Sequence, residues 1–324
     1  MADYDLKVAV IGGGTGLSTI LRGLKRYPLD ITAIVTVADD GGSSGSLRQD
    51  FQVPPPGDVR NVLVALSDVE PLVRELFQYR FSGNNGLAGH PTGNLLIAAM
   101  TDITGDFATA INMLSEVLKV RGKVLPVSNS PLSLCADYTD GTSAQGESAI
   151  PKLDKTIKRV YYNNLEPVAF SQAVEAIMEA DMILLGPGSL YTSIIPNVLL
   201  GEIAQAIVKT KAPCVYICNI MTQPGETEGL SAYDHVKAIE DHVGVNFIDK
   251  IIVNDEEVKE ETLERYTAQR AGLVELDEES LQAGNIEIIK SRIVAYSESG
   301  EVRHNAKKVA ATVFSLLLDL EEIE

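Results

Sequence analysis

The sequence predicts an α/β protein with a doubly wound, mostly parallel sheet that carries helical and antiparallel β embellishments. Three observations lead to this prediction. A strand, a glycine turn, a helix and a second strand follow one another within about thirty residues at the start, which describes a βαβ unit with a right-handed crossover. The alternation of strands and helices returns after Pro167. No repeat or linker separates the two stretches, so we expect residues 1–324 to form one domain.

In the first part of the chain, the spacing of apolar residues predicts the helices and strands. A β-branched run stops at Gly12, and leucines and isoleucines then recur at helical spacing. Residues 59–120 keep helical periodicity throughout and form the predicted helical segment. The expected elements are a strand over 7–11, a helix over 17–24, a strand over 31–37, and helices that include 70–81, 94–102 and 106–120.

A change of period marks the next element. From Lys123 to Tyr162 polar and apolar residues alternate, and Asp140-Gly141 separates two runs of strand-like composition. An Asp-Gly pair in this setting is a strong hairpin signal. We therefore predict an antiparallel β insertion at about residues 121–165.

The α/β alternation then continues to the end of the chain. Residues 255–279 hold ten acids and three bases, but their regular apolar positions favour a solvated helical face over disorder. The expected elements are a helix to 180, a strand over 182–185, a helix begun by Pro196, a strand over 215–220, a helix through 242, a strand over 248–253, a strand over 286–296 and a helix over 304–320.

Composition excludes several kinds of partner. The 324 residues carry a net charge of −18, which argues against nucleic acid and anionic membrane surfaces because both attract Lys and Arg clusters. No apolar run approaches the ~20 residues that cross a bilayer. Three cysteines without a Cys-x-x-Cys spacing and the absence of a leader pattern predict a cytoplasmic protein.

The strongest motif is the glycine loop that follows the first predicted strand. Gly12, Gly13, Gly14, Thr15 and Gly16 stand between a strand and a helix, where backbone N–H groups and the helix dipole bind phosphate. The loop lacks the third glycine of the dinucleotide fingerprint and the Lys-Ser/Thr pair of a Walker loop. A tight turn alone would need fewer glycines, so we expect a nucleotide bound in another way.

A second motif follows the second predicted strand. Asp39 and Asp40 stand at its carboxyl end, where doubly wound sheets bind ligands, and Ser43 and Ser44 follow them. The carboxylates can hold Mg²⁺ together with ligand phosphates, or one of them can accept a ribose hydroxyl. A self-capped Asp-Gly turn is the structural alternative.

Two further motifs lie in the helical segment. Asp58 follows three prolines and is predicted to cap a helix, in whose first turn Arg60 and Asn61 stand. The helix dipole opposes a cation there, so Arg60 is a candidate phosphate ligand, with a solvent-facing arginine as the alternative. His90 and Asn94 mark another helix start. His90 is a candidate base or ligand contact, although a lone loop histidine is more often plain surface.

Two strand ends in the second half complete the candidate site. The Gly186-Pro187-Gly188-Ser189 segment follows a buried strand and suits a second anionic group, or is only a turn. Asn219, Thr222 and Gln223 follow the next strand and offer hydrogen bonds to a base or sugar.

Five segments together carry a family resemblance that runs over essentially the whole chain. The sequence resembles the gluconeogenesis factor family, the YvcK-type proteins, and more distantly the 2-phospho-L-lactate transferase CofD. The segments are Gly12 to Ser18, Val37 to Gly45, Pro54 to Asp58, Gly186 to Ser193 and Ile217 to Glu226.

The resemblance implies a protein needed for bacterial growth and cell shape on gluconeogenic carbon sources, which binds UDP-sugars such as UDP-N-acetylglucosamine. It adds Tyr266 and Arg303 to the expected ligand contacts. Tyr266 can stack on uracil, and Arg303 can bind pyrophosphate at the start of the last helix. An unidentified protein partner is expected, and a homo-oligomer is compatible with the sequence.

The sequence is compatible with three functions. The leading one is a regulatory nucleotide-sugar sensor with no catalytic residue and no required cofactor. The second is a Mg²⁺-dependent phosphotransferase in which Asp39 and Asp40 are catalytic and bind the metal. The third is an oxidoreductase with NAD in the cleft, which the incomplete dinucleotide fingerprint disfavours.

Overall fold

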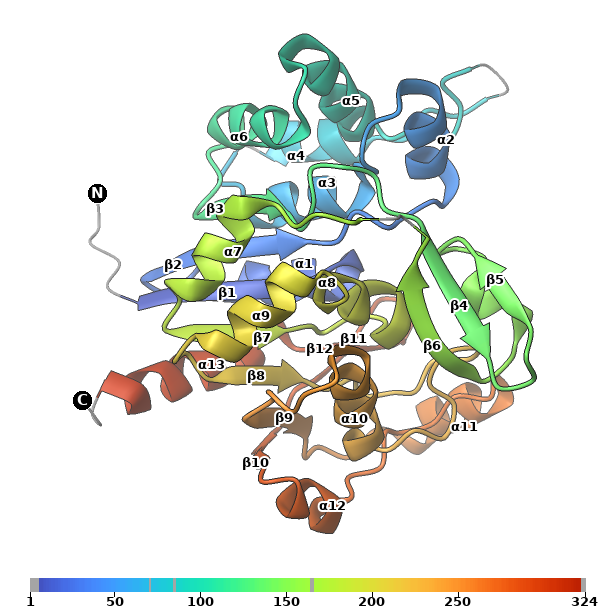
Figure 1. Cartoon of the computed structure of the whole chain (residues 1–324), viewed down its shortest axis with the longest axis vertical. Coiled ribbons are helices and arrows are strands. Elements are labelled where there is room, and N and C mark those ends of the chain that lie inside the picture. Colours follow the sequence, from blue (N-terminus) through green and yellow to red (C-terminus); the bar gives the residue numbers. More distant parts are fainter. Residues whose placement is uncertain (1–5, 70, 84–85, 164–165, 322–324) are drawn as a thin grey trace.

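Seven parallel strands form the central sheet of the chain (Figure 1). The computed structural model describes residues 6–69, 71–83, 86–163 and 166–321. Every pair of neighbouring strands in this sheet is parallel. In spatial order the strands are β10 (Glu287–Ser291), β9 (Lys250–Asn254), β8 (Cys214–Ile217), β7 (Met182–Leu185), β1 (Leu6–Gly12), β2 (Leu29–Val35) and β3 (Lys123–Pro126).

The strand order changes direction between β1 and β7. The chain proceeds outward from β1 to β2 and β3, and later from β7 to β8, β9 and β10 on the other side. In doubly wound sheets a ligand binds outside the carboxyl ends of the strands at such a point. The predicted doubly wound, Rossmann-like α/β class is therefore confirmed, and the topology places the candidate site after β1 and β7.

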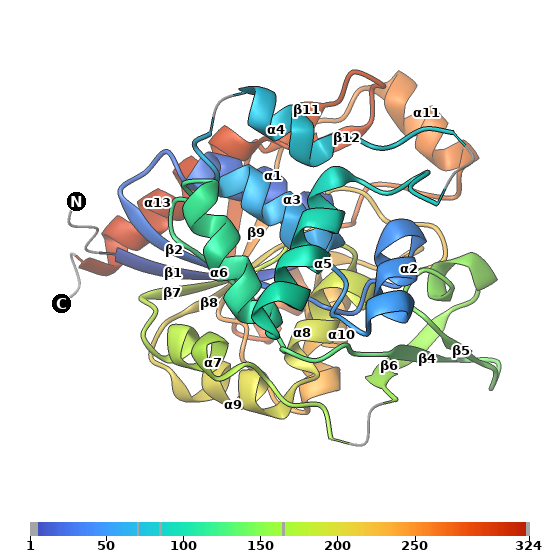
Figure 2. The same cartoon turned by 90° about the horizontal axis from the view of Figure 1, so that it is seen from above.

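Helices cover both faces of the sheet (Figure 2). Apolar side chains of both layers pack against buried strands such as β1, whose Val8–Gly12 stretch is buried. One face carries α1 (Gly14–Leu24), α3 (Gly57–Leu66) and α13 (Ala306–Glu321). The other carries α7 (Ser171–Met178), the π-helical turn η2 (Leu190–Ile194), α8 (Ile195–Val198), α9 (Gly201–Lys209) and α10 (Ala232–Val243).

The predicted helical segment over 59–120 begins within α3, and the rest of it forms a further layer beyond that helix. This layer consists of α4 (Pro71–Gln78), α5 (Thr92–Thr104) and α6 (Phe107–Val117), with α2 beside them (Gly42–Phe51). The first residue predicted for α4, Glu70, lies outside the described residues. The predicted elements include no helix over the α2 segment, because glycine and serine disfavour isolated helices. In the fold, Leu47 of α2 is buried and anchors it.

The β insertion is real but shorter than predicted. The antiparallel sheet consists of β4 (Leu134–Tyr138), β5 (Ser143–Gln145) and β6 (Ile157–Tyr162), with the 3-10 turn η1 (Ile150–Leu153) before β6. The hairpin at Asp140 is confirmed. The prediction placed Lys123–Pro126 in the insertion and was wrong. This stretch is β3, which pairs in parallel with β2 and extends the central sheet. Whether residues 1–324 act as one domain stays a prediction.

The C-terminal part differs from the prediction in two elements. The acidic stretch forms α11 (Glu260–Ala268) and α12 (Glu278–Ala283). The expected strand over 286–296 is divided: β10 ends at Ser291, and β11 (Val294–Tyr296) pairs with β12 (Val302–His304) in a separate antiparallel ribbon. Arg303 therefore lies in β12 and not at the start of α13, which begins at Ala306.

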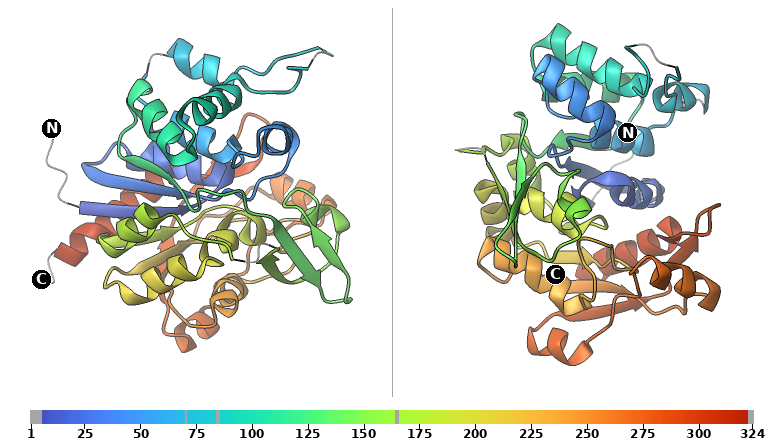
Figure 3. Two further views of the ribbon diagram at one scale, coloured as in Figure 1. Left: turned by 45° about the horizontal axis from the view of Figure 1, so that its top comes forward. Right: turned by 90° about the vertical axis from the view of Figure 1, so that its right-hand side faces the viewer.

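Three parts of the fold surround the carboxyl ends of the central strands. Viewed from that side, the antiparallel sheet, the α2 and α5 layer, and the region of α11 with β12 enclose this edge (Figure 3). Among the described residues, no single helix is long and apolar enough to cross a membrane; the pair Leu190–Val198 and Gly201–Lys209 passes that test only jointly and is bent by 75°.

Candidate functional site

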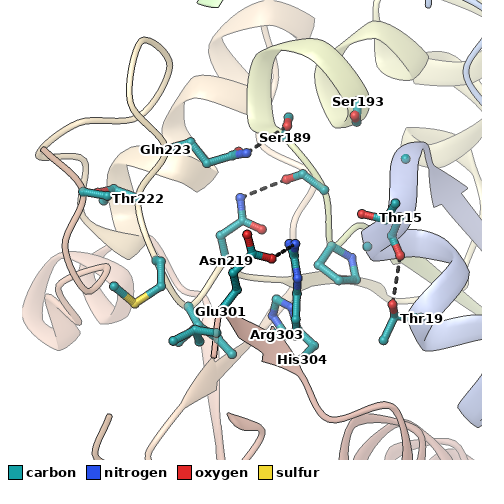
Figure 4. A pocket seen from close by; sticks show the side chains of 18 of the residues that line it. Thr15, Thr19, Ser189, Ser193, Asn219, Thr222, Gln223, Glu301, Arg303 and His304 are labelled. Carbon is teal, nitrogen blue, oxygen red and sulfur yellow. Dashed lines mark hydrogen bonds and ion pairs between the residues drawn. The ribbon is translucent and has the colours of Figure 1, made fainter. Parts of the chain in front are cut away.

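A cavity of about 780 Å³ opens at the carboxyl ends of β1 and β7 (Figure 4). Segments from both halves of the chain line it, together with α11 and the β11–β12 ribbon. It thus lies where the strand order predicted a ligand. The predicted residues that line it are Gly13, Gly14, Thr15, Gly16, Pro187, Gly188, Ser189, Asn219, Thr222, Gln223, Tyr266 and Arg303.

The two glycine loops touch each other, and at Gly16 they leave no room for a side chain. A Cβ at Gly16 would lie 2.6 Å from the Pro187 carbonyl oxygen, and a Cβ at Gly188 would lie 3.4 Å from the Gly13 oxygen. Gly14 has a φ of +67°, which favours glycine. The glycines therefore bring the start of α1 against the loop after β7.

The start of α1 is partly open for an anion, because the Asp58 carboxyl group takes only the Gly14 N–H. Its N-cap, Gly13, makes no side-chain capping bond, so backbone N–H groups of the first turn have no partner within the helix. Thr15 stands in this turn and lines the cavity. This part of the cavity has the features of a phosphate cradle.

Amide side chains after β8 hold the second loop in place. Asn219 Nδ2 donates a hydrogen bond to the Gly188 carbonyl oxygen at 2.9 Å, and Gln223 Nε2 donates to Ser189 Oγ at 3.1 Å (Figure 4). Gln223 Oε1 is buried without a partner in the described structure. An unpaired buried acceptor is costly, so this amide is available to a donor on a ligand.

The wall formed by α11 and β12 presents an aromatic ring and a guanidinium. Tyr266 OH accepts a hydrogen bond from Val302 N at 3.0 Å, which holds the ring against β12. Arg303 is exposed and pairs with Glu301 at 2.5 Å. His304 is turned inward, and its Nε2 lies 2.9 Å from the Cys218 carbonyl oxygen. Because a carbonyl only accepts, Nε2 carries the proton.

Half-buried carboxyl groups stand at the glycine loops: Glu147 lines the cavity, Asp58 contacts the first loop and Glu226 contacts Tyr191 just after the second. Burial, with a smaller contribution from Asp39, raises the pKa of Asp58 to about 6. Burial followed by repulsion from neighbouring acids, Asp39 first, raises the pKa of Glu147 to about 8. Burial also raises the pKa of Glu226 to about 7, against the hydrogen bonds it accepts from Tyr191 and Thr192. The cavity thus keeps protonatable acids beside an anion cradle.

The structure corrects the role predicted for Asp58. The N-cap of α3 is Pro56, and Asp58 stands inside the first turn. Its carboxyl group hydrogen-bonds with the Gly14 N–H. Asp58 therefore connects α3 to the glycine loop and does not cap its own helix.

Asp39 and Asp40 turn toward different backbone segments. Asp39 Oδ1 accepts from Gly41 N at 2.8 Å, and Asp40 Oδ1 accepts from Ser148 N at 2.9 Å. The first bond is the self-capped turn of the structural alternative. In the described part of the chain, no three His, Cys, Asp or Glu side chains form a group suited to a metal ion. The pair thus does not form a chelate by itself.

The remaining predicted residues lie outside the cavity lining. Gly12 ends β1, and a Cβ there would lie 3.7 Å from Gly186 Cα, so these two glycines pack behind the cavity. Ser44 lies against Gly57. The others form a separate hydrogen-bonded cluster: Ser43, Arg60, Asn61, His90 and Asn94.

Sequence reasoning missed Glu147, which lines the cavity. It lies in the β insertion next to Ser148, which reaches Asp40 across 108 residues of chain. No motif surrounds Glu147 in the sequence, and only the docking of the insertion brings it to the site. Arg265 and Glu301 were missed for the same kind of reason.

Known proteins resemble this chain over nearly its full length. A family model described as 2-phospho-L-lactate transferase CofD matches residues 8–294. The gluconeogenesis factor of Bacillus subtilis (strain 168) is 53% identical over 314 residues, which are 97% of this chain and 98% of the relative. That of Listeria monocytogenes serovar 1/2a is 49% identical over 311 residues, 96% and 95% of the two chains. The crystal structure of a Bacillus halodurans protein has a TM-score of 0.93 at 52% identity and covers 95% of this chain and 99% of that one.

Proposed function

The chain belongs to the CofD family and, within it, to the gluconeogenesis factors, and on that basis we propose that it binds UDP-sugars, UDP-N-acetylglucosamine first among them. In this proposal it is a regulatory protein required for growth and cell morphogenesis under gluconeogenic conditions. A partner protein reads its ligand-bound state, and no cofactor is required.

The observation that carries the proposal is the division of one cavity into chemically different parts. The first turn of α1 after Gly14 and the loop after β7 supply N–H groups for a pyrophosphate. The amide of Gln223, with its free buried acceptor, suits the N–H of a uracil. Tyr266 and Arg303 stand in the wall formed by α11 and β12 and supply a ring for stacking and a charge for phosphate.

The net charge of −18 does not oppose this proposal. The phosphate cradle consists of backbone N–H groups, which bind anions locally, whereas acids such as Glu260 and Glu261 stand in the first turn of α11. Carboxyl groups that border the cradle, such as Glu147, have raised pKa values. Acids kept protonated by burial can donate hydrogen bonds to sugar hydroxyls.

Isothermal titration with UDP-N-acetylglucosamine tests the proposal. We expect saturable heat with the wild type and affinity at least about tenfold weaker in Tyr266→Ala and Arg303→Ala, which is 1.4 kcal/mol or more. Lys307→Ala, an exposed cation near β12 that does not line the cavity, is the matched control and keeps the affinity. Absence of heat in the wild type, or tighter binding of NAD than of the UDP-sugar, contradicts the proposal.

A Mg²⁺-dependent phosphotransferase is the second candidate function. The match to a transferase family over residues 8–294 favours it. Asp39 acts electrostatically on both Asp58 and Glu147, and a cation near Asp39 would relieve this repulsion. Turnover of nucleotide sugars, measured with and without Mg²⁺, separates the candidates: a Mg²⁺-dependent product that is lost in Asp39→Asn supports the transferase, and binding without product supports the sensor.

A further inference from the structure

Three helices begin at one place outside the cavity. The helices are α2, α3 and α5, and none of them has a side-chain capping bond at its N-terminus. Glycines in their first turns let them approach closely. A Cβ at Gly57 would lie 2.5 Å from Ser44 Oγ, and a Cβ at Gly93 would lie 2.9 Å from Arg60 Cδ. The positive ends of three helix dipoles therefore meet.

A directed hydrogen-bond network joins these helix starts. Arg60 Nη1 donates to Asn94 Oδ1 at 2.9 Å, and Asn94 Nδ2 donates to Ser43 Oγ at 3.0 Å. Because a guanidinium only donates, the amide orientation is fixed. Ser43 Oγ then lies 2.8 Å from His90 Nδ1. The network presents donors and the ring of His90 at one point.

Arg60 is a buried charge that still has an unused donor. It is only 7% exposed, and its Nε is buried without a partner in the described structure. Burial, followed by repulsion from Arg80, lowers its pKa, against weaker attraction from Asp58 and Asp39. Among the ion pairs found within the described residues, none involves Arg60 or Arg80. Arg80 donates a hydrogen bond to the Gly89 carbonyl oxygen, next to His90, so it stands beside the same cluster. An anion would stabilise two arginines that have no salt bridge.

We propose that Ser43, Arg60, Arg80, His90 and Asn94 form a second anion site, which binds a phosphate group and is separate from the cavity. None of these residues lines the cavity. Asp58 stands between the two, because it contacts the glycine loop on one side and belongs to α3 on the other. The chain thus offers donors to a phosphate group at a place other than the cavity, and this inference does not depend on the proposed function.

The chemistry of the site favours phosphate over a metal or a neutral group. Its groups are guanidinium, amide, hydroxyl and helix N–H donors, with a histidine that becomes a further donor when protonated. Asp58 and Asp39 attract Arg60 and offset part of the positive charge, and Asp39 Oδ2 lies at the start of α3, 2.8 Å from the position of a Cβ at Gly57. The phosphate is either free or part of a phosphate monoester, since both present the same oxygens.

Proton NMR of the full-length protein tests the site directly. The chain has four histidines, so the His90 ring resonance is assigned as the one lost in His90→Gln. Inorganic phosphate is titrated near pH 7 against potassium chloride of matched ionic strength. We expect a saturable shift of this resonance alone, about tenfold weaker binding in Arg80→Gln and in Ser43→Ala, and no change in Arg292→Gln, an exposed arginine in another part of the fold.

The same titration with methyl phosphate identifies the source of the group. Tighter binding of methyl phosphate supports a site for an organic phosphate ester, and tighter binding of inorganic phosphate supports a free-phosphate site. The proposal is overturned when the His90 resonance moves no more with phosphate than with chloride, or moves equally in Arg80→Gln. Arg80 is exposed, so its variant keeps the fold. UDP-N-acetylglucosamine is also titrated into Arg80→Gln. If this variant still releases heat, the cavity binds its ligand, so a failure of the second anion site is distinguishable from a failure of the proposed function.

Discussion

The carboxyl group of Asp58 occupies the space next to Gly13. A Cβ at Gly13 would lie 2.7 Å from Asp58 Oδ2 and 2.5 Å from Thr36 Cγ2. Gly13 has φ of −163°, an extended conformation open to any residue, so the requirement for glycine is one of space alone. The contact joins the first turn of α3 to the phosphate cradle.

Gly13→Ala is therefore expected to destabilise the protein and weaken the cavity's ligand. Overpacking of this kind costs about 1–3 kcal/mol, because Thr36 and Asp58 must move and the N–H groups of the cradle move with them. Urea unfolding and titration with UDP-N-acetylglucosamine measure the two effects. Gly201→Ala, where no atom lies within 4 Å of the added Cβ, is the control and should neither destabilise the protein nor weaken ligand binding. Unchanged unfolding in Gly13→Ala contradicts the contact.

Glu147 makes the stability of the protein depend on pH. Its pKa of about 8 in the folded chain exceeds the ordinary value of 4.5, mainly because of burial. The folded state thus binds more protons between these two values, and the free energy of unfolding falls as pH rises through that window.

The Glu147→Gln variant isolates this effect. Since one pKa unit corresponds to about 1.4 kcal/mol, we expect the wild type to lose at least about that much relative to the variant between pH 5 and 9. Urea unfolding at the two pH values measures it, with Glu298→Gln, an exposed glutamate, as the control. Parallel pH curves for wild type and Glu147→Gln would show that Glu147 is ionised in the folded chain.

The contribution of His304 to the free energy of unfolding depends on pH in the opposite direction. Burial lowers its pKa to about 4, against the hydrogen bond to Cys218. The unfolded chain binds the proton first, so this contribution to stability is present above the ordinary pKa of 6.5 and is lost as pH falls through about 4. We expect the His304 ring to stay neutral down to about pH 5, and an NMR titration of its ring resonance measures this. A midpoint near 6.5 contradicts the burial of His304, and His304→Gln assigns the signal.

Asn219 positions the second glycine loop through a donor. Asn219→Asp places a carboxylate opposite the Gly188 oxygen, which the wild-type amide reaches at 2.9 Å. Two acceptors repel, so we expect a loss of about 1–3 kcal/mol in stability or ligand binding. Asn163→Asp, which stands outside the cavity, is the matched control. Full binding and stability in Asn219→Asp would show that the loop holds its position without this bond.

Much of the framework follows from local patterns. The strand and glycine turn at Gly12, the helix to Leu24 and the hairpin at Asp140 all appear where periodicity and turn chemistry predict them. Short-range preferences are sufficient there because the apolar face and the turn residues agree. The placement of loops after strands also follows, since parallel strands bring their carboxyl ends to one edge.

Other elements depend on partners far away in the sequence. The α2 segment is rich in glycine and serine and becomes helical only where Leu47 enters the core. The stretch from Lys123 joins the central sheet because β2 offers it an edge. The segment with Arg303 becomes a strand because β11 pairs with it. Such pairing energy is absent from local sequence windows.

By itself the sequence determined the doubly wound class, the glycine loops at strand ends and the motif residues of these loops that now line the cavity, because these depend on spacing along the chain. The tertiary structure decided how the candidate residues divide. It placed Tyr266 and Glu147 at the cavity and gathered Ser43, Arg60 and His90 into a separate cluster. That division depends on which helix starts approach one another, and packing between distant segments, not local preference, sets those distances.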